Sequence, residues 1–189
     1  MAEFERIDSS IQFDGYERKV HIQRYTVAGK YTKEDDVVLD MACGTGYGKE
    51  YLKGKYIGVD KVALCGNIVA NLNEWKPDFD FDVGVSLETI EHIENYKNVI
   101  ENLKQAKKYI IYSTPIIPTV GLNQFHVNDF TYAELKDMFK GWGEIVHEEK
   151  QLHPQFSDGL YGIIVVKKYE HNGTDKNIQK TRDIEKVVS

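Results

Sequence analysis

The sequence predicts an α/β fold in which a mostly parallel sheet is covered by helices. From about residue 35 to 168, short apolar runs alternate with segments of helical periodicity, which is the pattern of a parallel sheet with helical connections. The last part of this region, 143–168, contains two strand-like runs with no helical pattern between them. We therefore expect a C-terminal antiparallel hairpin, with its turn near 153–159.

The individual elements follow from apolar periodicity. The runs expected to form the main strands are 37–39, 56–59, 81–87, 109–112 and 161–166. Apolar residues at helical spacing predict helices over about 16–28, 96–106 and 132–142. The last of these helices has a start signal, because Thr131 and Glu134 have the spacing of a capping box.

Composition excludes several classes of protein. The formal net charge is −6, and no Lys-rich or Arg-rich block precedes the C-terminal tail, so binding to duplex nucleic acid is disfavoured. The sequence has no apolar run of about 18 residues and no apolar leader, so neither a membrane span nor a secretory signal is expected. Cys43 and Cys65 lack the spacing of a disulfide framework or zinc site. We expect a cytoplasmic protein.

The most informative pattern is VVLDMACGTGYG at 37–48, where a buried strand ends in Asp40 and a glycine-rich turn opens a helix. Glycine lets the backbone pass close beneath a ligand, and the N–H groups at a helix start suit a carboxylate or phosphate. The glycine spacing argues against a dinucleotide site, because Lys49 stands where G-x-G-x-x-G requires glycine. Asp60 ends the second strand, where its carboxylate is placed to accept hydrogen bonds from two ribose hydroxyls.

These motifs resemble those of the class I S-adenosylmethionine-dependent methyltransferases, which have a Rossmann-like fold. VLDMACGTGYG is similar to the first motif of the family, YIGVDK to its ribose motif and FDVGVSLETIEHIEN to its fourth-strand motif. YSTP followed by FHVNDFTYAELKDMF is similar to the segment after the fifth strand in a subgroup with many sugar and small-molecule members. The resemblance runs from about residue 16 to 168. It implies S-adenosyl-L-methionine as cofactor and methyl transfer to an oxygen or nitrogen of a small-molecule acceptor.

The resemblance also implies positions for the cofactor. Asp40, Gly44 and Gly46 would line its methionine moiety, and Asp60 would hold the ribose. Ala42 belongs to the same turn and stands where a glycine is more usual. We expect residues 1–34 to form an N-terminal lid segment, 35–168 the methyltransferase domain and 169–189 a flexible tail.

One departure from the family concerns the third strand. Only 21 residues separate Asp60 from Asp82, where the family normally has a crossover helix and a third strand. We interpret 67–70 as that strand and 61–66 as too short for a helix, so the sheet is shortened there. Asn71 then occupies the position that usually carries an adenine-contacting acid. The adenine side is left open, or is completed by Trp75 or by the second subunit of a homodimer.

Glu88, Glu91 and His92 lie at i, i+3 and i+4 after the fourth strand, so they would share one face of a helix. His126 follows the fifth strand at the same edge of the sheet. One reading is a general base that takes a proton from the acceptor. The other is a divalent ion held by two carboxylates and two imidazoles, which would acidify the acceptor. A third reading is structural, with Glu88 starting a helix and His126 fixing its loop.

The Glu-x-x-Glu-His pattern with a later His resembles the metal set of the small-RNA 3′-end 2′-O-methyltransferases. It is also similar to that of the ubiquinone-pathway O-methyltransferases. We favour active-site residues without a metal, with Glu91, His92 and His126 as catalytic groups and Glu88 beside the cofactor. Two other functions stay open, namely an RNA 3′-end 2′-O-methyltransferase with a metal site and a non-catalytic S-adenosylmethionine-binding protein.

His21, Arg24 and Tyr25 share one face of the first predicted helix. Resemblance to family members with an H-x-x-R-Y segment implies that this helix covers the cofactor. Arg24 would lie near the cofactor carboxylate, which a guanidinium can bind through two hydrogen bonds. The alternative is an amphipathic helix whose Tyr25 packs on the core.

Overall fold

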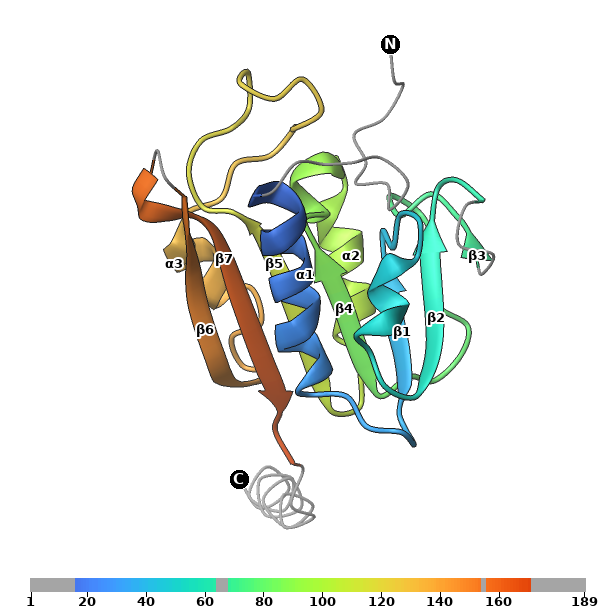
Figure 1. The fold of residues 1–189 in the computed structure, drawn as a ribbon. Coiled ribbons are helices and arrows are strands. Elements are labelled where there is room, and N and C mark those ends of the chain that lie inside the picture. The colour runs from blue at the N-terminus through green and yellow to red at the C-terminus, as the bar shows by residue number, and fades with distance from the viewer. Residues whose placement is uncertain (1–15, 64–67, 154–155, 171–189) are drawn as a thin grey trace, which may run out of the picture.

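The computed structural model describes residues 16–63, 68–153 and 156–170, which form a seven-stranded sheet with helices on both faces (Figure 1). The strands are β1 (Val37–Met41), β2 (Lys55–Asp60), β3 (Ile68–Val69), β4 (Val83–Leu87), β5 (Tyr109–Pro115), β6 (Gly143–His153) and β7 (Phe156–Lys168). The helices are α1 (Tyr16–Gly29), α2 (Tyr96–Leu103) and α3 (Tyr132–Asp137), with the 3-10 helices η1 (Tyr47–Glu50) and η2 (Ile90–His92). No helix in these ranges combines the length and the apolar character that a membrane span requires.

The strand order β3-β2-β1-β4-β5-β7-β6 confirms the predicted Rossmann-like α/β sheet. β3, β2, β1, β4 and β5 run parallel, whereas β7 is antiparallel to both β5 and β6. β4 is buried at all five of its positions, as expected for a parallel strand covered on both faces. The carboxyl ends of the parallel strands meet at one edge of the sheet, where ligands bind in open α/β folds.

The sheet separates two apolar clusters. α1 covers one face, where Val27 and Ala28 pack with Val85 of β4 and Val165 of β7. α2 and α3 cover the other face; the residues they bury there include Val99, Leu103 and Leu135. Figure 1 shows α1 (blue) crossing in front of the sheet between β4 and β7. The first helix is therefore one layer of the fold, and only its first half reaches the carboxyl edge of the sheet.

The predicted capping box is confirmed at the start of α3. The Thr131 hydroxyl accepts from the Glu134 N–H at 3.2 Å, and the Glu134 carboxylate accepts from the Thr131 N–H at 2.8 Å. The helix itself is shorter than predicted and ends at Asp137. Beyond that point the backbone forms i→i+3 turns, such as the bond from the Trp142 N–H to the Phe139 carbonyl. Such turns keep the apolar residues at near-helical spacing without extending the helix.

The segment after the glycine-rich turn, where the sequence predicted a helix, forms only the four-residue 3-10 helix η1. α1, which precedes β1 in the chain, packs against the segment that contains η1. A Cβ added at Gly29 would overlap the carbonyl oxygen of Tyr51. A Cβ added at Gly48 would overlap the ring of Tyr25. Both glycines therefore allow a close approach between α1 and the segment that follows the turn.

The shortening around the third strand is also observed. β3 pairs with β2 through Val59 and Ile68 and through Asp60 and Val69, which confirms part of the predicted strand. Residues 61–63 contain no helix, and the rest of the predicted short crossover, at 64–67, lies outside the described residues.

The C-terminal antiparallel hairpin is confirmed, but its turn is shorter than predicted. His153 pairs with Phe156, so β7 begins within the range predicted to be a turn. The antiparallel register continues up to residues 154–155, which are not described. Residues 171–189, most of the predicted tail, are also outside the described part of the chain.

Candidate active site

A cavity of about 880 Å³ lies at the carboxyl edge of the sheet, within the usual size range for sites that bind small molecules. Most of the residues predicted for the site line it, namely Tyr25, Ala42, Gly44, Asp60, Asn71, Glu88, Glu91, His92 and His126. Three predicted cofactor residues, Arg24, Asp40 and Gly46, are not among its lining residues. The cavity is also lined by residues that were not predicted as site residues, including His21, Tyr47, Asn123, Phe125 and Tyr161.

The turn after β1 takes its shape from three residues with positive φ. Gly44 and Gly46 have φ of 57° and 76°, and Ala42 has φ of 61°. This backbone region favours glycine, which gives a physical reason for the more usual glycine at position 42. A Cβ added at Gly44 would have nothing within 4 Å, so the turn faces open space. Gly46 precedes η1 and shapes the turn without lining the cavity.

Asp60 ends β2 and holds the turn from the side. Its Oδ2 accepts from the Gly44 N–H at 2.9 Å, and its Oδ1 accepts from the Val62 N–H at 3.1 Å. A carboxylate has about four lone-pair sites. Asp60 can therefore bind the turn and still accept hydrogen bonds from ligand hydroxyls in the cavity.

Asn71 lines the cavity just after β3 and is exposed. Its Oδ1 accepts from both the backbone N–H and the side-chain amide of Asn73, at 3.1 and 3.0 Å. Trp75, which the sequence suggested for the adenine side, packs instead on the core with Phe79 and is not among the lining residues.

Asp40 was expected beside the cofactor, but its side chain is fully buried beneath the turn. The hydroxyls of Tyr25 and Tyr56 both donate to its Oδ2, at 3.0 and 2.9 Å. Burial raises the pKa of the Asp40 carboxyl to about 7, although the two tyrosine hydroxyls oppose this shift. Asp40 therefore joins α1, β1 and β2 below the cavity. The sequence left two alternatives for Tyr25, namely a place beside the cofactor or packing on the core. Tyr25 packs on the core and also lines the cavity.

Arg24 is also fully buried, at the junction of α1 with the C-terminal hairpin. Its Nε donates to Gln151 Oε1 at 2.7 Å and lies 3.7 Å from Glu88 Oε1. The guanidinium carbon lies 4.0 Å from the centroid of the Tyr161 ring. Nη1 and Nη2 have no hydrogen-bond partner among the described residues. Two strong donors therefore lie behind the cavity wall formed by Glu88 and Tyr161.

The prediction that Glu88, Glu91 and His92 share a helix is wrong. Glu88 follows β4 with φ of 52°, and η2 spans only Ile90–His92, because the backbone at Ile93 is already extended. The three side chains nevertheless line the same cavity. Glu88 is held there by the Ser113 hydroxyl of β5, which donates to its Oε1 at 2.7 Å.

Glu91 is 1% exposed and has a hydrogen bond on only one of its carboxylate oxygens. Oε2 accepts from the Thr114 hydroxyl at 3.0 Å, whereas Oε1 is buried without a partner among the described residues. Burial raises the pKa of the Glu91 carboxyl well above its usual value, and the neighbouring Glu88 charge raises it further. A buried carboxylate oxygen without a donor is costly, so this atom is suited to bind a ligand.

His92 and His126 lie ring against ring, with centroids 4.6 Å apart. His92 Nδ1 is 3.1 Å from the Phe125 carbonyl oxygen, so in the neutral ring the proton is on Nδ1 and the lone pair is on Nε2. Nε2 lies 3.9 Å from Glu91 Oε1. This geometry suits His92 to take a proton beside the buried carboxylate.

His126 has both ring nitrogens engaged within its own loop. Nδ1 is 2.7 Å from the Thr119 hydroxyl, and Nε2 is 3.1 Å from the Asn123 side-chain nitrogen. The Phe125 N–H donates to Asn123 Oδ1 at 3.0 Å, which directs the NH₂ group towards His126. Candidate ligand atoms of Glu91, His92 and His126 lie within 4.8 Å of one another, a spacing that a metal ion could bridge. To bind an ion, His126 would have to give up one of these loop contacts.

His21 and Tyr47 form a part of the wall that the sequence did not assign. His21 Nδ1 lies 3.1 Å from the Tyr47 hydroxyl, and Tyr47 packs edge-on against Tyr25. Burial lowers the pKa of His21 well below its usual value, and the Arg24 charge lowers it further. The shared helical face with Arg24 and Tyr25 could have indicated His21, whereas no pattern in the sequence pointed to Tyr47.

The chain shares its fold with S-adenosylmethionine-dependent methyltransferases of known structure, although no protein-family model matches it and no curated protein does. One similar chain belongs to the complex between the Haloferax volcanii Trm112 methyltransferase activator and a methyltransferase, with TM-score 0.64, 12% identity, and coverage of 82% of this chain and 93% of that one. The N-methyltransferase NodS from Bradyrhizobium japonicum, solved with S-adenosylhomocysteine, has TM-score 0.62 and 12% identity over 84% of this chain and 90% of NodS. The [4+2]-cyclase SpnF has TM-score 0.63 and 11% identity over 84% of each chain.

Proposed function

We propose that this protein is an S-adenosylmethionine-dependent methyltransferase acting on an oxygen or nitrogen of a small molecule. The observation that carries the proposal is the turn at Gly44, which faces open space in the cavity beside the Asp60 carboxylate. The fold adds support, because NodS, which has this fold, was solved with the demethylated cofactor. SpnF is a cyclase with the same fold, so the activity must be argued from the site.

The chain offers a suitable group for each part of the cofactor. The turn at Ala42, Gly44 and Gly46 would hold the methionine moiety, and Asp60 would accept from the ribose hydroxyls. Asn71 would contact the adenine, and Tyr25 and Glu88 would close the wall near the sulfur. The cofactor would supply a methyl group activated by a positively charged sulfur.

Two buried residues, Asp40 and Arg24, are proposed to support the cofactor part of the site without lining the cavity. Asp40 fixes the turn through Tyr25 and Tyr56. Arg24 would act on the cofactor carboxylate only through a rearrangement of the wall, because it does not line the cavity. Both are therefore proposed as positioning residues.

Catalysis is proposed to depend on Glu91 and His92. Glu91 is buried in the cavity wall with its Oε1 3.9 Å from His92 Nε2, and His92 carries its lone pair on Nε2 and has a side chain 26% exposed. A proton taken from the acceptor can therefore pass from the buried carboxylate to the partly exposed imidazole and on to water. His126 is assigned the supporting role of holding Phe125 and Asn123 in place at the acceptor end.

A small acceptor fits this cavity better than an RNA end. The segment that borders the acceptor end, residues 116–135, contains no Lys or Arg. The phosphates of RNA would have no cationic partner along that segment. The formal net charge of −6 also opposes a polyanion.

The cofactor proposal is tested by titrating the protein with S-adenosylhomocysteine. Asp60→Ala should weaken binding by roughly 1–3 kcal/mol, because it removes charge-assisted hydrogen bonds to the ribose. Asp80→Ala is the matched control, since Asp80 is exposed and, within the described ranges, forms an ion pair with Lys107 at the surface. No binding by the unaltered protein would overturn the proposal, and equal affinity in both variants would overturn the role of Asp60.

A metal-assisted reaction is the second candidate, favoured by the spacing of Glu91, His92 and His126. We propose that no metal is needed, because both ring nitrogens of His126 have partners in the loop. Methyl transfer should then continue after treatment with a chelator. Loss of activity that a single added divalent ion restores would establish the metal mechanism instead.

A further inference from the structure

We propose that Asn71 recognises the adenine of the cofactor through a ring nitrogen, which accepts a hydrogen bond from the Asn71 side-chain amide, and not through the 6-amino group. The inference rests on the proposed methyltransferase function and makes Asn71 a specificity-determining residue of its cofactor site. It is carried by the single orientation in which the structure holds the Asn71 amide.

The side-chain oxygen of Asn71 is already fully used within the protein. Oδ1 accepts from the Asn73 backbone N–H at 3.1 Å and from Asn73 Nδ2 at 3.0 Å. A backbone N–H can only donate, so the atom of the Asn71 amide that faces it must be the oxygen. A carbonyl oxygen has two lone pairs, and Asn73 engages both. Asn71 therefore has no side-chain acceptor left for a ligand.

The nitrogen of the same amide is the atom that can meet a ligand. Nδ2 carries two N–H donors and forms no hydrogen bond with the described residues. Asn71 is exposed and lines the cavity, two residues after Val69, which pairs with the proposed ribose ligand Asp60. The ring nitrogens of adenine accept hydrogen bonds, whereas its 6-amino group donates them. Because two donors cannot pair, a ring nitrogen is the part of adenine that fits Asn71.

The start of α2 fixes Asn73 and, through it, the Asn71 amide. Asn73 Oδ1 accepts from the Asn95 N–H at 2.8 Å, and the Asn73 carbonyl accepts from Asn95 Nδ2 at 2.9 Å. Asn98 of α2 adds a hydrogen bond from its Nδ2 to the Leu72 carbonyl at 2.9 Å. Turning the Asn71 amide over would place its NH₂ group against two donors of Asn73. The amide therefore keeps one orientation, although the third strand beside it is short.

The residue type at this position decides which part of adenine is recognised. An acid, which is the more usual residue there in the family that the sequence resembles, has about four lone-pair sites. It could accept from Asn73 and from the 6-amino group at the same time. The amide of Asn71 has its acceptor sites occupied by Asn73 and keeps only its donors. Asn71 should therefore discriminate between cofactor analogues by their ring nitrogens and not by their amino group.

The test measures how tightly the full chain binds S-adenosylhomocysteine and four of its analogues, by isothermal titration calorimetry. Three analogues carry C–H in place of adenine N1, N3 or N7, and the fourth carries hydrogen in place of the 6-amino group. One of the three ring analogues should bind roughly three- to tenfold more weakly than S-adenosylhomocysteine, the range expected for one neutral hydrogen bond.

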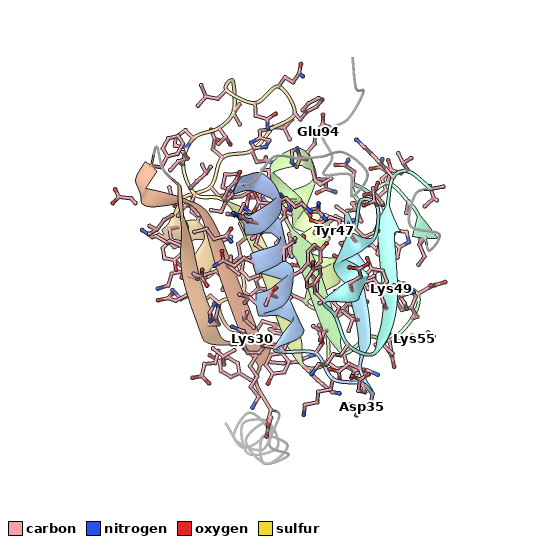
Figure 2. All side chains as sticks on the ribbon, viewed as in Figure 1. Lys30, Asp35, Tyr47, Lys49, Lys55 and Glu94 are labelled. Atoms are coloured by element: carbon pink, nitrogen blue, oxygen red, sulfur yellow. The ribbon has the colours of Figure 1, made fainter. Side chains whose placement is uncertain are left out.

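Two variants assign this loss to Asn71. Asn71→Ala should abolish it, while removal of the 6-amino group should change the affinity by the same factor as in the unaltered protein. Asn71→Asp should also abolish it, because its carboxylate can accept both hydrogen bonds from Asn73 but has no donor. Glu94→Ala is the control and should keep the loss, since Glu94 is exposed at the same edge of the molecule and is not a lining residue (Figure 2).

The possible failures can be told apart. Equal binding of all three ring analogues by the unaltered protein would overturn the inference about Asn71 alone. So would a loss that persists in either Asn71 variant, or an effect of Asn71→Ala that is confined to the analogue without the 6-amino group. Failure of the unaltered protein to bind S-adenosylhomocysteine would overturn the methyltransferase proposal itself.

Discussion

The two sides of the cavity are held in shape by different means. On the turn side, residues 42–48 form a backbone shape that α1 supports from below through the close contact of Tyr25 with Gly48. The loop side consists of η2, which carries Glu91 and His92, and residues 116–131, which are joined to η2 by the hydrogen bond from the Val127 N–H to the Glu91 carbonyl. Residues 116–131 are held by side-chain hydrogen bonds. Asp129 Oδ1, for example, accepts from the Thr119 N–H at 2.6 Å, the Thr119 hydroxyl at 3.3 Å and the Val120 N–H at 3.0 Å.

Because they are held in different ways, the two sides of the cavity should differ in how much stability a substitution costs. A close steric contact leaves no room for added volume, so the turn side should respond sharply to a single methyl group. Several hydrogen bonds hold the same segment of the loop side, so the loss of one of them should cost little stability. On the loop side, the substitutions with large effects should instead be those of Glu91 and His92, and they should lower the rate of methyl transfer.

The largest expected effect separates the two histidines of the loop side. His92→Gln should lower the rate of methyl transfer roughly 10²–10⁴-fold, the usual contribution of a general base. His126→Gln should lower it at most about tenfold, because the proposed role of His126 is only to hold the loop. Initial rates with an accepted small-molecule substrate, measured as labelled methyl incorporated, give both values. Equal losses in the two variants would return His126 to the catalytic role that the sequence predicted.

The second effect tests the steric support of the turn side. Gly48→Ala should destabilise the protein by roughly 1–3 kcal/mol, because the new methyl group overlaps the Tyr25 ring. The cost should fall when Tyr25→Leu is combined with it, a coupling that urea unfolding of the single and double variants would measure. Gly121→Ala is the control, since Gly121 has φ of 85° but nothing near its Cβ position. It should show backbone strain and no coupling to Tyr25. Additive effects of Gly48→Ala and Tyr25→Leu would contradict the steric account.

The smallest effect concerns Asp40 and the pH dependence of stability. Its pKa is raised to about 7 in the folded protein, so the folded state binds a proton that the unfolded state has already lost above pH ~4. The Asp40 contribution should therefore fall as the pH rises from about 4 to 7, by roughly 2 kcal/mol between pH 5 and 7. Urea unfolding at both pH values should show this loss in the unaltered protein and a smaller loss in Asp40→Asn. An equal loss in both would place the buried proton on another group, such as Glu91.

Most of the sheet could be predicted because apolar runs and turn residues are local properties of the sequence. The strand that includes Ile68 and Val69 was expected because the family it resembles has a third strand at that point, and the capping box of Thr131 and Glu134 was found from spacing alone. Most site residues that line the cavity follow predicted strands, whose carboxyl ends meet at one edge. Tyr25 precedes the strands and was assigned from the resemblance to family members with an H-x-x-R-Y segment.

What could not be predicted depends on contacts between distant segments. Nothing local indicates that η1 ends after one turn or that α1 covers the sheet face beside it. The glycines of the turn look alike in sequence, yet Gly44 faces open space and Gly48 is packed under Tyr25. Asp40 was expected beside the ligand because the family resemblance places it there. Its burial could not be foreseen, because the two tyrosines that bury it lie at positions 25 and 56, outside the first motif.

The junction of α1 with β6 has a consequence for the order in which the chain can fold as it is made. Gln151 accepts from Arg24 and donates to the Val20 carbonyl, contacts that span 127 and 131 residues. At a synthesis rate of about 5–20 residues per second, α1 waits on the order of ten seconds for its partner strand. Until then Arg24 has no Gln151 to bind, and the apolar face of α1 lacks its contacts with β7. Among the described elements, α1 is therefore made before every strand it packs against, and its apolar face stays open to a chaperone until β6 and β7 have been made.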